Sequence, residues 1–294
     1  MREWFASLGA GLKTTFIGGS RLFILAPLIP LIAILPEFAQ HIVEIKLGMF
    51  ASKAAFNALQ MDPTRWAFGY AKVAGLVIAI FAAARYWGGA RERWWDLRTV
   101  AWKQFGIALA ANVAVSIPFY LIGTLLSATT KPVFDALATI ATLPFLVWLI
   151  GPLLGDATMT LRRAYTGGWG RLLLIALLAV AAFWPASLLH QWDHRWALGA
   201  PSPMVWALMT WDAVLVGLIA CWTGAALGAG YRGGSSDAEP RGEPLPVGEE
   251  LSRYPRPRCR SCFPLWPLAG SCGSCSRRMR RRPPSRAWRM RCRR

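Results

Sequence analysis

Six long stretches of almost exclusively apolar residues, separated by short segments rich in basic residues, dominate the pattern of this chain. They cover residues 21–40, 66–84, 104–130, 136–155, 172–189 and 204–231. A helix rises about 1.5 Å per residue, so roughly 20 apolar residues cross the ~30 Å of hydrocarbon in a bilayer. The pattern therefore predicts an all-α, polytopic membrane helical bundle with six transmembrane helices in residues 1–231.

Basic residues are distributed unevenly between the two sides of this predicted bundle. One side has eleven of them, namely Arg2, Lys13, Arg21, Arg85, Arg91, Arg93, Arg98, Lys103, Arg162, Arg163 and Arg171. The other side has five, namely Lys46, Lys53, Arg65, Lys131 and Arg195. Because Lys and Arg are enriched in cytoplasmic loops, we expect the richer side to be cytoplasmic. Both termini would then be cytoplasmic in a multi-pass protein of the bacterial inner membrane.

The first, third and fifth apolar stretches share a pattern. A basic residue opens each stretch and a proline follows 14 or 15 residues later, in the pairs Arg21 and Pro36, Lys103 and Pro118, and Arg171 and Pro185. The segments in front mix Arg, Trp and aliphatic residues, most clearly at 91–105, as in amphipathic helices of the headgroup region. This favours three hairpin repeats, each preceded by a cytoplasmic amphipathic helix. Coincidence in a low-complexity apolar sequence is the alternative.

One of these segments carries a family resemblance. Residues 161–165, Leu-Arg-Arg-Ala-Tyr, are followed at 169–174 by Trp-Gly-Arg-Leu-Leu-Leu. This run resembles the repeated element of YciC-like bacterial six-span proteins and of the membrane domain beside some glycerophosphodiester phosphodiesterases. As a pattern, the resemblance extends over residues 1–231. It implies an integral membrane helical domain and carries no catalytic motif over to this chain.

The composition changes abruptly after residue 231. Residues 253–294 contain 14 Arg and no acidic residue, and they supply most of the net charge of +18. Residues 232–294 are therefore predicted to be a disordered, basic, Cys/Arg/Pro-rich cytoplasmic tail, because they have too little apolar surface to form a core. Such a tail can bind anionic lipid headgroups, whereas no nucleic-acid-binding fold accompanies it. Out-of-frame translation of GC-rich DNA is the alternative origin of this segment.

The cysteines give little support for a metal site. Four of them form two pairs, Cys259 with Cys262 and Cys272 with Cys275. Four thiolates can hold zinc, but the nine residues between the pairs are fewer than zinc ribbons usually have. We therefore expect no zinc at these pairs. Cys221 lies inside the sixth stretch and is expected to be a small apolar residue.

Histidines and carboxylates gather at two predicted helix ends on the outer side. The two sets are Glu37, His41 and Glu44, and His190, Asp193 and His194, each spaced to lie on one helix face. Imidazoles and carboxylates are ligands of divalent metals, which makes these residues candidates for a metal site. The favoured interpretation is different: two hydrated helix ends facing lipid headgroups, with no metal and no cofactor.

Two ionisable residues lie inside predicted spans. Lys72 is six residues into the second stretch and Asp212 eight residues into the sixth, both counted from the outer side. At 1.5 Å per residue these depths are about 9 and 12 Å, so we expect the two charges to face each other. Charges inside membranes are costly and often mark functional sites. A purely structural salt bridge is the alternative, and Asn112 adds a polar group in the third stretch.

The function predicted from these features is non-enzymatic. No nucleophile with a neighbouring base, phosphate-binding glycine loop or pair of catalytic carboxylates is recognisable in the spans. We expect an integral inner-membrane protein that interacts with membrane lipids or organises the membrane. The alternative is a transporter of small solutes or ions that uses Lys72, Asn112 and Asp212.

Overall fold

The computed structural model describes residues 2–90 and 93–233, and this part of the chain is helical, without strands. The α-helices are α1 (Arg2–Lys13), α2 (Gly19–Leu25), α3 (Leu28–Lys46), α4 (Lys53–Leu59), α5 (Pro63–Arg85), α6 (Trp102–Leu125), α7 (Lys131–Leu153), α8 (Leu161–Gly167), α9 (Trp169–Ala197) and α10 (Ser202–Gly233). Short 3₁₀ segments occupy Met49–Ala51 and Leu97–Thr99, and π-helical segments occupy Thr14–Gly18 and Tyr86–Ala90. The all-α prediction is confirmed for these residues. The predicted tail and its cysteine pairs lie outside them, except for the last residues of α10.

Six of these helices are long and apolar enough to cross a membrane, namely α3, α5, α6, α7, α9 and α10. This confirms the number of candidate spans and their order along the chain. Their ends differ from the apolar stretches in the sequence. In particular, α9 continues to Ala197, beyond the predicted end at residue 189, so His190 and His194 lie on the helix itself.

The predicted start of the first span, at residue 21, is wrong. The backbone leaves the helical conformation at Ala26 (φ −149°, ψ 66°), and α3 begins at Leu28. Pro27 explains the break, because a proline disfavours helical geometry in the residue before it. Gly18 and Gly19, in front of this break, are both helical.

The expected amphipathic helix at 91–105 is also wrong. Between Arg93 and Ala101 the structure has a single 3₁₀ segment, and α6 begins only at Trp102. Arg85 provides the reason, because its guanidinium donates hydrogen bonds to the backbone carbonyls of Trp94 and Asp96 at 2.9 and 2.7 Å. These hydrogen bonds hold residues 93–101 as a loop against the end of α5. Helices do precede the first and fifth spans, where α1–α2 and α8 lie.

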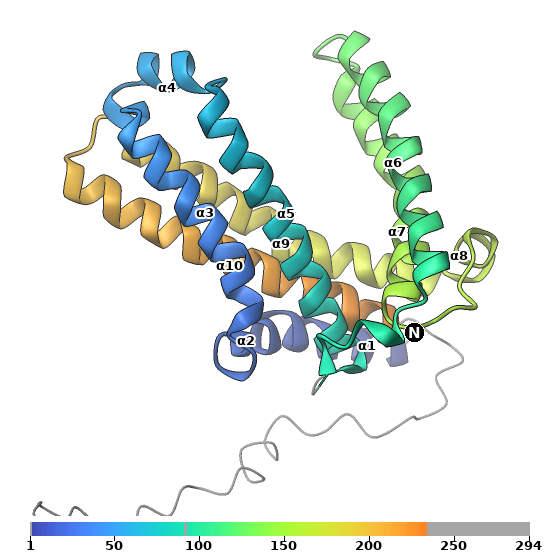
Figure 1. The fold of residues 1–294 in the computed structure, drawn as a ribbon. Helices are drawn as coiled ribbons and strands as arrows, with labels where there is room; N and C mark the ends of the chain where they lie inside the picture. The colour runs from blue at the N-terminus through green and yellow to red at the C-terminus, as the bar shows by residue number, and fades with distance from the viewer. Residues whose placement is uncertain (1, 91–92, 234–294) are drawn as a thin grey trace, which may run out of the picture. The chain divides into compact units, whose positions relative to one another are not determined.

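Helix α10 is the centre of the described bundle. It packs against α9, α5, α3 and the N-terminal helical segment (Figure 1). The pairs α3 with α5, α6 with α7 and α9 with α10 each pack together, although α6 contacts little besides α7. Three hairpins are thus present, whereas their origin as repeats of one unit stays a prediction.

Two glycines let α10 lie unusually close to α5. A Cβ atom at Gly224 would overlap the carbonyl oxygen of Ile80, and one at Gly228 would be 2.6 Å from that of Ala84. Small residues spaced four apart allow this backbone contact between membrane helices. The contact fixes α10 against α5, and α10 in turn carries Asp212 between α3 and α9.

The last turns of α10 are anchored by a loop carboxylate. The hydroxyl of Tyr231 donates a hydrogen bond of 2.7 Å to Oδ2 of Asp156, in the loop between α7 and α8. The backbone N–H and the hydroxyl of Thr158 donate to Oδ1 of the same carboxylate. Burial by itself would raise the pKa of Asp156, but the hydrogen bonds from Thr158 and Tyr231 outweigh it and lower the pKa below its usual value.

Candidate functional site

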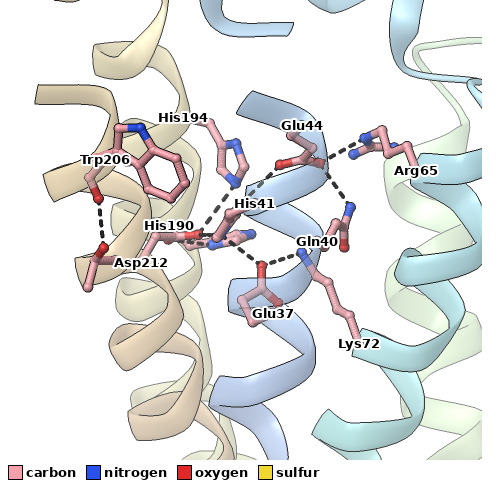
Figure 2. Close-up of polar contacts among 11 residues, drawn as sticks. Glu37, Gln40, His41, Glu44, Arg65, Lys72, His190, His194, Trp206 and Asp212 are labelled. Carbon is pink, nitrogen blue, oxygen red and sulfur yellow. Dashed lines mark hydrogen bonds and ion pairs between the residues drawn. The ribbon is translucent and has the colours of Figure 1, made fainter. Parts of the chain in front are cut away.

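Asp212 is the centre of a buried polar cluster between α3, α9 and α10 (Figure 2). Its Oδ2 atom lies 2.9 Å from Nε2 of His41 and 3.5 Å from Nε2 of His194. Its Oδ1 atom lies 2.7 Å from Nδ1 of His190. One carboxylate therefore meets all three histidines of the protein, which come from two different helices.

Two further carboxylates reach His41 from its own helix. Nδ1 of His41 lies 3.0 Å from Oε2 of Glu44, and Nε2 lies 3.2 Å from Oε1 of Glu37. The spacing of these residues along α3 puts all three on the face that packs inward. We call the following six residues the histidine–carboxylate cluster: Glu37, His41, Glu44, His190, His194 and Asp212.

Helix α5 supplies two cations that hold the glutamates of the cluster. Lys72 donates from Nζ to Oε1 of Glu37 at 2.7 Å, and Arg65 donates from Nε to Oε1 of Glu44 at 2.8 Å. Nε2 of Gln40 also donates to Oε1 of Glu44, at 2.9 Å. Buried carboxylates are tolerated when a cation and hydrogen bonds compensate them. Both oxygens of Glu44 have such partners, whereas Oε2 of Glu37 has no hydrogen-bond partner within the described residues.

The interpretation of these residues as hydrated helix ends facing headgroups is wrong. Glu37, His41, Glu44 and Asp212 are each no more than 1% exposed. They are buried because α3, α9 and α10 pack with these polar faces toward one another. Asp193 is buried as well, and its Oδ2 atom has no hydrogen-bond partner within the described residues.

The expected direct pair between Lys72 and Asp212 does not form. Lys72 donates to Glu37, and Glu37 contacts His41, which in turn contacts Asp212. The similar depth of the two charges does place them in one network, but two side chains of α3 connect them. Asn112 lies elsewhere, where its Nδ2 donates to the carbonyls of Ala108 and Phe145 and joins α6 to α7.

Gln40 and Arg65 belong to this site but were not among the predicted residues. Gln40 had a usable signal, because it lies three residues after Glu37 and four before Glu44, on the same helix face. Arg65 had no such signal in the sequence, because its contact with Glu44 depends on how α5 packs against α3 after the connection through α4.

The spacing of donor atoms in the cluster suits a metal ion. Two overlapping sets have their donor atoms within 4.8 Å of one another: His41, His194 and Asp212, and Glu37, His190 and Asp212. Around a tetrahedral zinc ion with bonds of about 2.0–2.1 Å, neighbouring donors are about 3.3 Å apart. The donor-to-donor distances at Nε2 of His41, 2.9 Å to Asp212 and 3.2 Å to Glu37, are close to that value.

Glu44 completes this arrangement as a supporting carboxylate. It contacts Nδ1 of His41, which leaves Nε2 directed toward Asp212. Metal-binding histidines usually have such a carboxylate on the second ring nitrogen, where it fixes the tautomer and the ring orientation. The charges agree too. Histidines bind metals in the neutral form, and in that state three carboxylates in the cluster and an ionised Asp193 outnumber the two cations Arg65 and Lys72 by two, an excess that a divalent cation would balance.

Comparisons with models of known protein families, with curated proteins and with solved structures find no match to this chain.

Proposed function

We propose that this integral membrane protein binds a divalent transition-metal ion through His41, His194 and Asp212, with Glu37 and His190 as adjoining ligands. The observation that carries the proposal is the meeting of all three histidines at the buried carboxylate of Asp212. Buried polar groups at this density are costly in a membrane bundle and typically mark function. A bound ion accounts for their convergence and for the excess negative charge around them.

The ligand set restricts the type of ion. Imidazole nitrogens together with carboxylate oxygens suit zinc, iron, nickel or copper, whereas calcium and magnesium prefer oxygen ligands alone. Zinc is therefore the first ion to test. The role that we propose is metal binding, which the convergence of three histidines on Asp212 supports directly.

The proposal includes a location. The excess of basic residues in one set of loops supports an inner-membrane protein with both termini in the cytoplasm. The cluster would then lie at the outer end of the bundle, where α3 and α9 end and α10 begins. Contact of α1 and α8 with lipid headgroups on the cytoplasmic side is part of the same proposal.

Ion transport is a second candidate function, favoured by one observation. Contacts run without interruption from Lys72 through Glu37, His41 and Asp212 to His190. The two outermost side chains are partly exposed, Lys72 at 22% and His190 at 24%. Such a chain of charged groups across a bundle is typical of ion pathways.

The deciding experiment measures bound zinc. Protein purified in detergent, stripped with a chelator and dialysed against zinc should retain roughly one ion per chain, as expected for one site of this ligand type. Asp212→Asn should abolish zinc retention, because it replaces the carboxylate that both ligand sets share with an amide. Asp135→Asn, in an exposed pair with Lys131 on α7, is the matched control and should bind zinc normally.

Two outcomes would contradict the metal centre: wild-type protein without zinc, or Asp212→Asn that binds zinc like the control. Zinc uptake into liposomes that contain the purified protein separates the two candidate functions. Uptake that depends on Asp212 supports transport, whereas zinc binding without uptake supports a resident metal ion.

A further inference from the structure

A groove on the membrane-facing side of α3 and α5 adjoins the cluster and shares with it the side chains Gln40, Arg65 and Lys72, which hold the cluster's glutamates. Its volume is about 690 Å³, and its lining is mostly apolar. Polar side chains line it at two levels, with Lys72 two helical turns inside and Gln40 and Arg65 at one end. From there the groove follows one face of α5 over Gly69, Val73 and Val77, spaced four residues apart.

We propose that this groove binds one anionic phospholipid of the bilayer, with the phosphate at Arg65, the glycerol ester groups near Lys72 two helical turns deeper, and an acyl chain along the face of Gly69, Val73 and Val77. The proposal does not depend on the metal centre. It gives a specific site to the contact with lipid, at the opposite end of the bundle from the amphipathic α1 and α8.

Cations rather than carboxylates face the groove. The carboxylates of Glu37 and Glu44 are buried behind Lys72 and Arg65, so the two cations face the groove with their side chains 22% and 21% exposed. Lys72 uses one of its three N–H donors on Glu37. Arg65 bonds through Nε and Nη1, and within the described part of the chain its Nη2 group has no partner. Both cations thus retain donors for the oxygens of a lipid, Arg65 for the phosphate and Lys72 for the ester groups.

The length and the aromatic residues of the groove favour a lipid over a soluble anion. Arg65 lies in the first turn of α5, and Val77 is twelve residues further on, which is about 18 Å along a helix. That length is comparable to the depth of one leaflet, about half of the ~30 Å hydrocarbon core. Trp66 and Tyr70, 39% and 69% exposed, lie beside the polar end, as aromatic side chains do at the membrane interface.

Native mass spectrometry of the purified protein, with phosphatidylglycerol or phosphatidylcholine added, tests the proposal. Wild-type protein should retain one phosphatidylglycerol in preference to phosphatidylcholine. Arg65→Gln should reduce this preference about fivefold, as expected for one basic side chain near a membrane surface. Inorganic phosphate at millimolar concentration should not compete, because it lacks the chain that the groove holds.

Gly69→Trp provides a test that leaves the charges unchanged. A Cβ at Gly69 meets nothing within 4 Å, so the new side chain fills the groove without disturbing the helix, and lipid retention should be lost. Gly106→Trp on α6 is the matched control, because a Cβ there is equally free, and it should retain the lipid. Gly69→Trp should still bind zinc, so failure here is distinguishable from failure of the metal centre.

Three results would overturn the proposal. Equal retention of the two lipids would remove the role of the cations, and equal behaviour of Gly69→Trp and Gly106→Trp would place the lipid elsewhere. Competition by inorganic phosphate as effective as by phosphatidylglycerol would identify the ligand as a soluble anion.

Discussion

Nε2 of His41 lies 2.9 Å from Oδ2 of Asp212, although 171 positions separate the two residues in the chain. The second ring nitrogen of His41 contacts Glu44. The imidazole is therefore held between carboxylates from α3 and α10, with little freedom to rotate. A ligand fixed in this way is preorganised, which favours tight and geometrically selective metal binding.

Glu44→Gln should weaken zinc binding without abolishing it. The substitution removes the charge that orients His41 but none of the proposed ligand atoms, and changes of this kind typically cost 10–100-fold in metal affinity. Competition with a chromophoric chelator measures the dissociation constant, with Asp135→Asn as the control. No binding at saturating zinc would make Glu44 itself a ligand, and unchanged affinity would mean that it has no supporting role.

Lys72→Met should destabilise the bundle because it leaves the buried carboxylate of Glu37 without its cation. The expected loss is about 2–3 kcal/mol, less than for a fully buried pair, because the lysine is partly exposed. Adding Glu37→Gln should recover part of the loss, so that the two changes are not additive. Thermal unfolding in detergent measures the cycle.

The exposed pair Lys131 and Asp135 on α7 provides the matched control cycle. Its coupling energy should stay below about 1 kcal/mol, as for other exposed ion pairs. Equal coupling in the two cycles would show that burial adds nothing to the interaction of Lys72 with Glu37.

Gly224→Val should lower stability strongly, because its Cβ would overlap the backbone of α5 at Ile80. Forcing extra atoms into a packed interface costs about 1–3 kcal/mol, which should appear as a lower thermal midpoint in detergent. Gly106→Val on α6 makes the same change where a Cβ meets nothing within 4 Å. If both variants unfold at the same temperature, the contact of α10 with α5 is looser than described.

Asp156 should make stability depend on pH in the acid range. Its folded-state pKa is lowered, so its carboxylate stabilises the fold fully above the unfolded-state pKa of about 4. That contribution is lost as the pH falls below 4 and through the folded-state value. Asp156→Asn should therefore be less stable than wild type at pH 7, with a difference that shrinks toward pH 3.

Thermal midpoints between pH 7 and pH 3 measure this difference. Tyr231→Phe removes one donor to Asp156, so it should also be less stable than wild type at pH 7, with a difference that shrinks toward pH 3. A gap between wild type and Asp156→Asn that is constant across the range would contradict the prediction.

Reporter fusions test the proposed orientation. A reporter at Gly199, between α9 and α10, should be active outside the cytoplasm, and one at Ala157, between α7 and α8, inside it. The physical reason is the excess of basic residues on the side that includes Arg162 and Arg163. Cytoplasmic activity at Gly199 would reverse the orientation and move the metal centre to the cytoplasmic side.

The six candidate spans could be predicted because the hydrocarbon of a membrane imposes one requirement, a long apolar helix. Whether a segment meets it can be judged directly from its residues. The deviations have local causes. Pro27 moved the start of α3, and the hydrogen bonds of Arg85 to nearby carbonyls replaced the helix expected at 91–105. Neither a proline-induced break nor a loop held by one guanidinium changes the average hydropathy of a stretch.

The candidate site was only half predictable. Spacing along α3 and α9 identified the two polar faces correctly, because helix geometry fixes which side chains share a face. Whether those faces turn toward lipid headgroups or toward each other depends on helix packing, which the spacing does not specify. The two faces turn toward each other because Asp212 on α10 lies at the same depth as both, and its carboxylate pairs with histidines from each.

The central position of α10 has a consequence for how the protein is made. The other five spans leave the ribosome first, yet the surfaces on α3, α5 and α9 that contact α10 stay unmatched until it arrives. During that interval His41 and the two histidines of α9 lack the carboxylate of Asp212, and the glycines that fit against α5 are not yet in place. A chain that stalls before α10 would therefore hold three histidines without their common partner, and cells continuously remove incompletely folded chains by proteolysis.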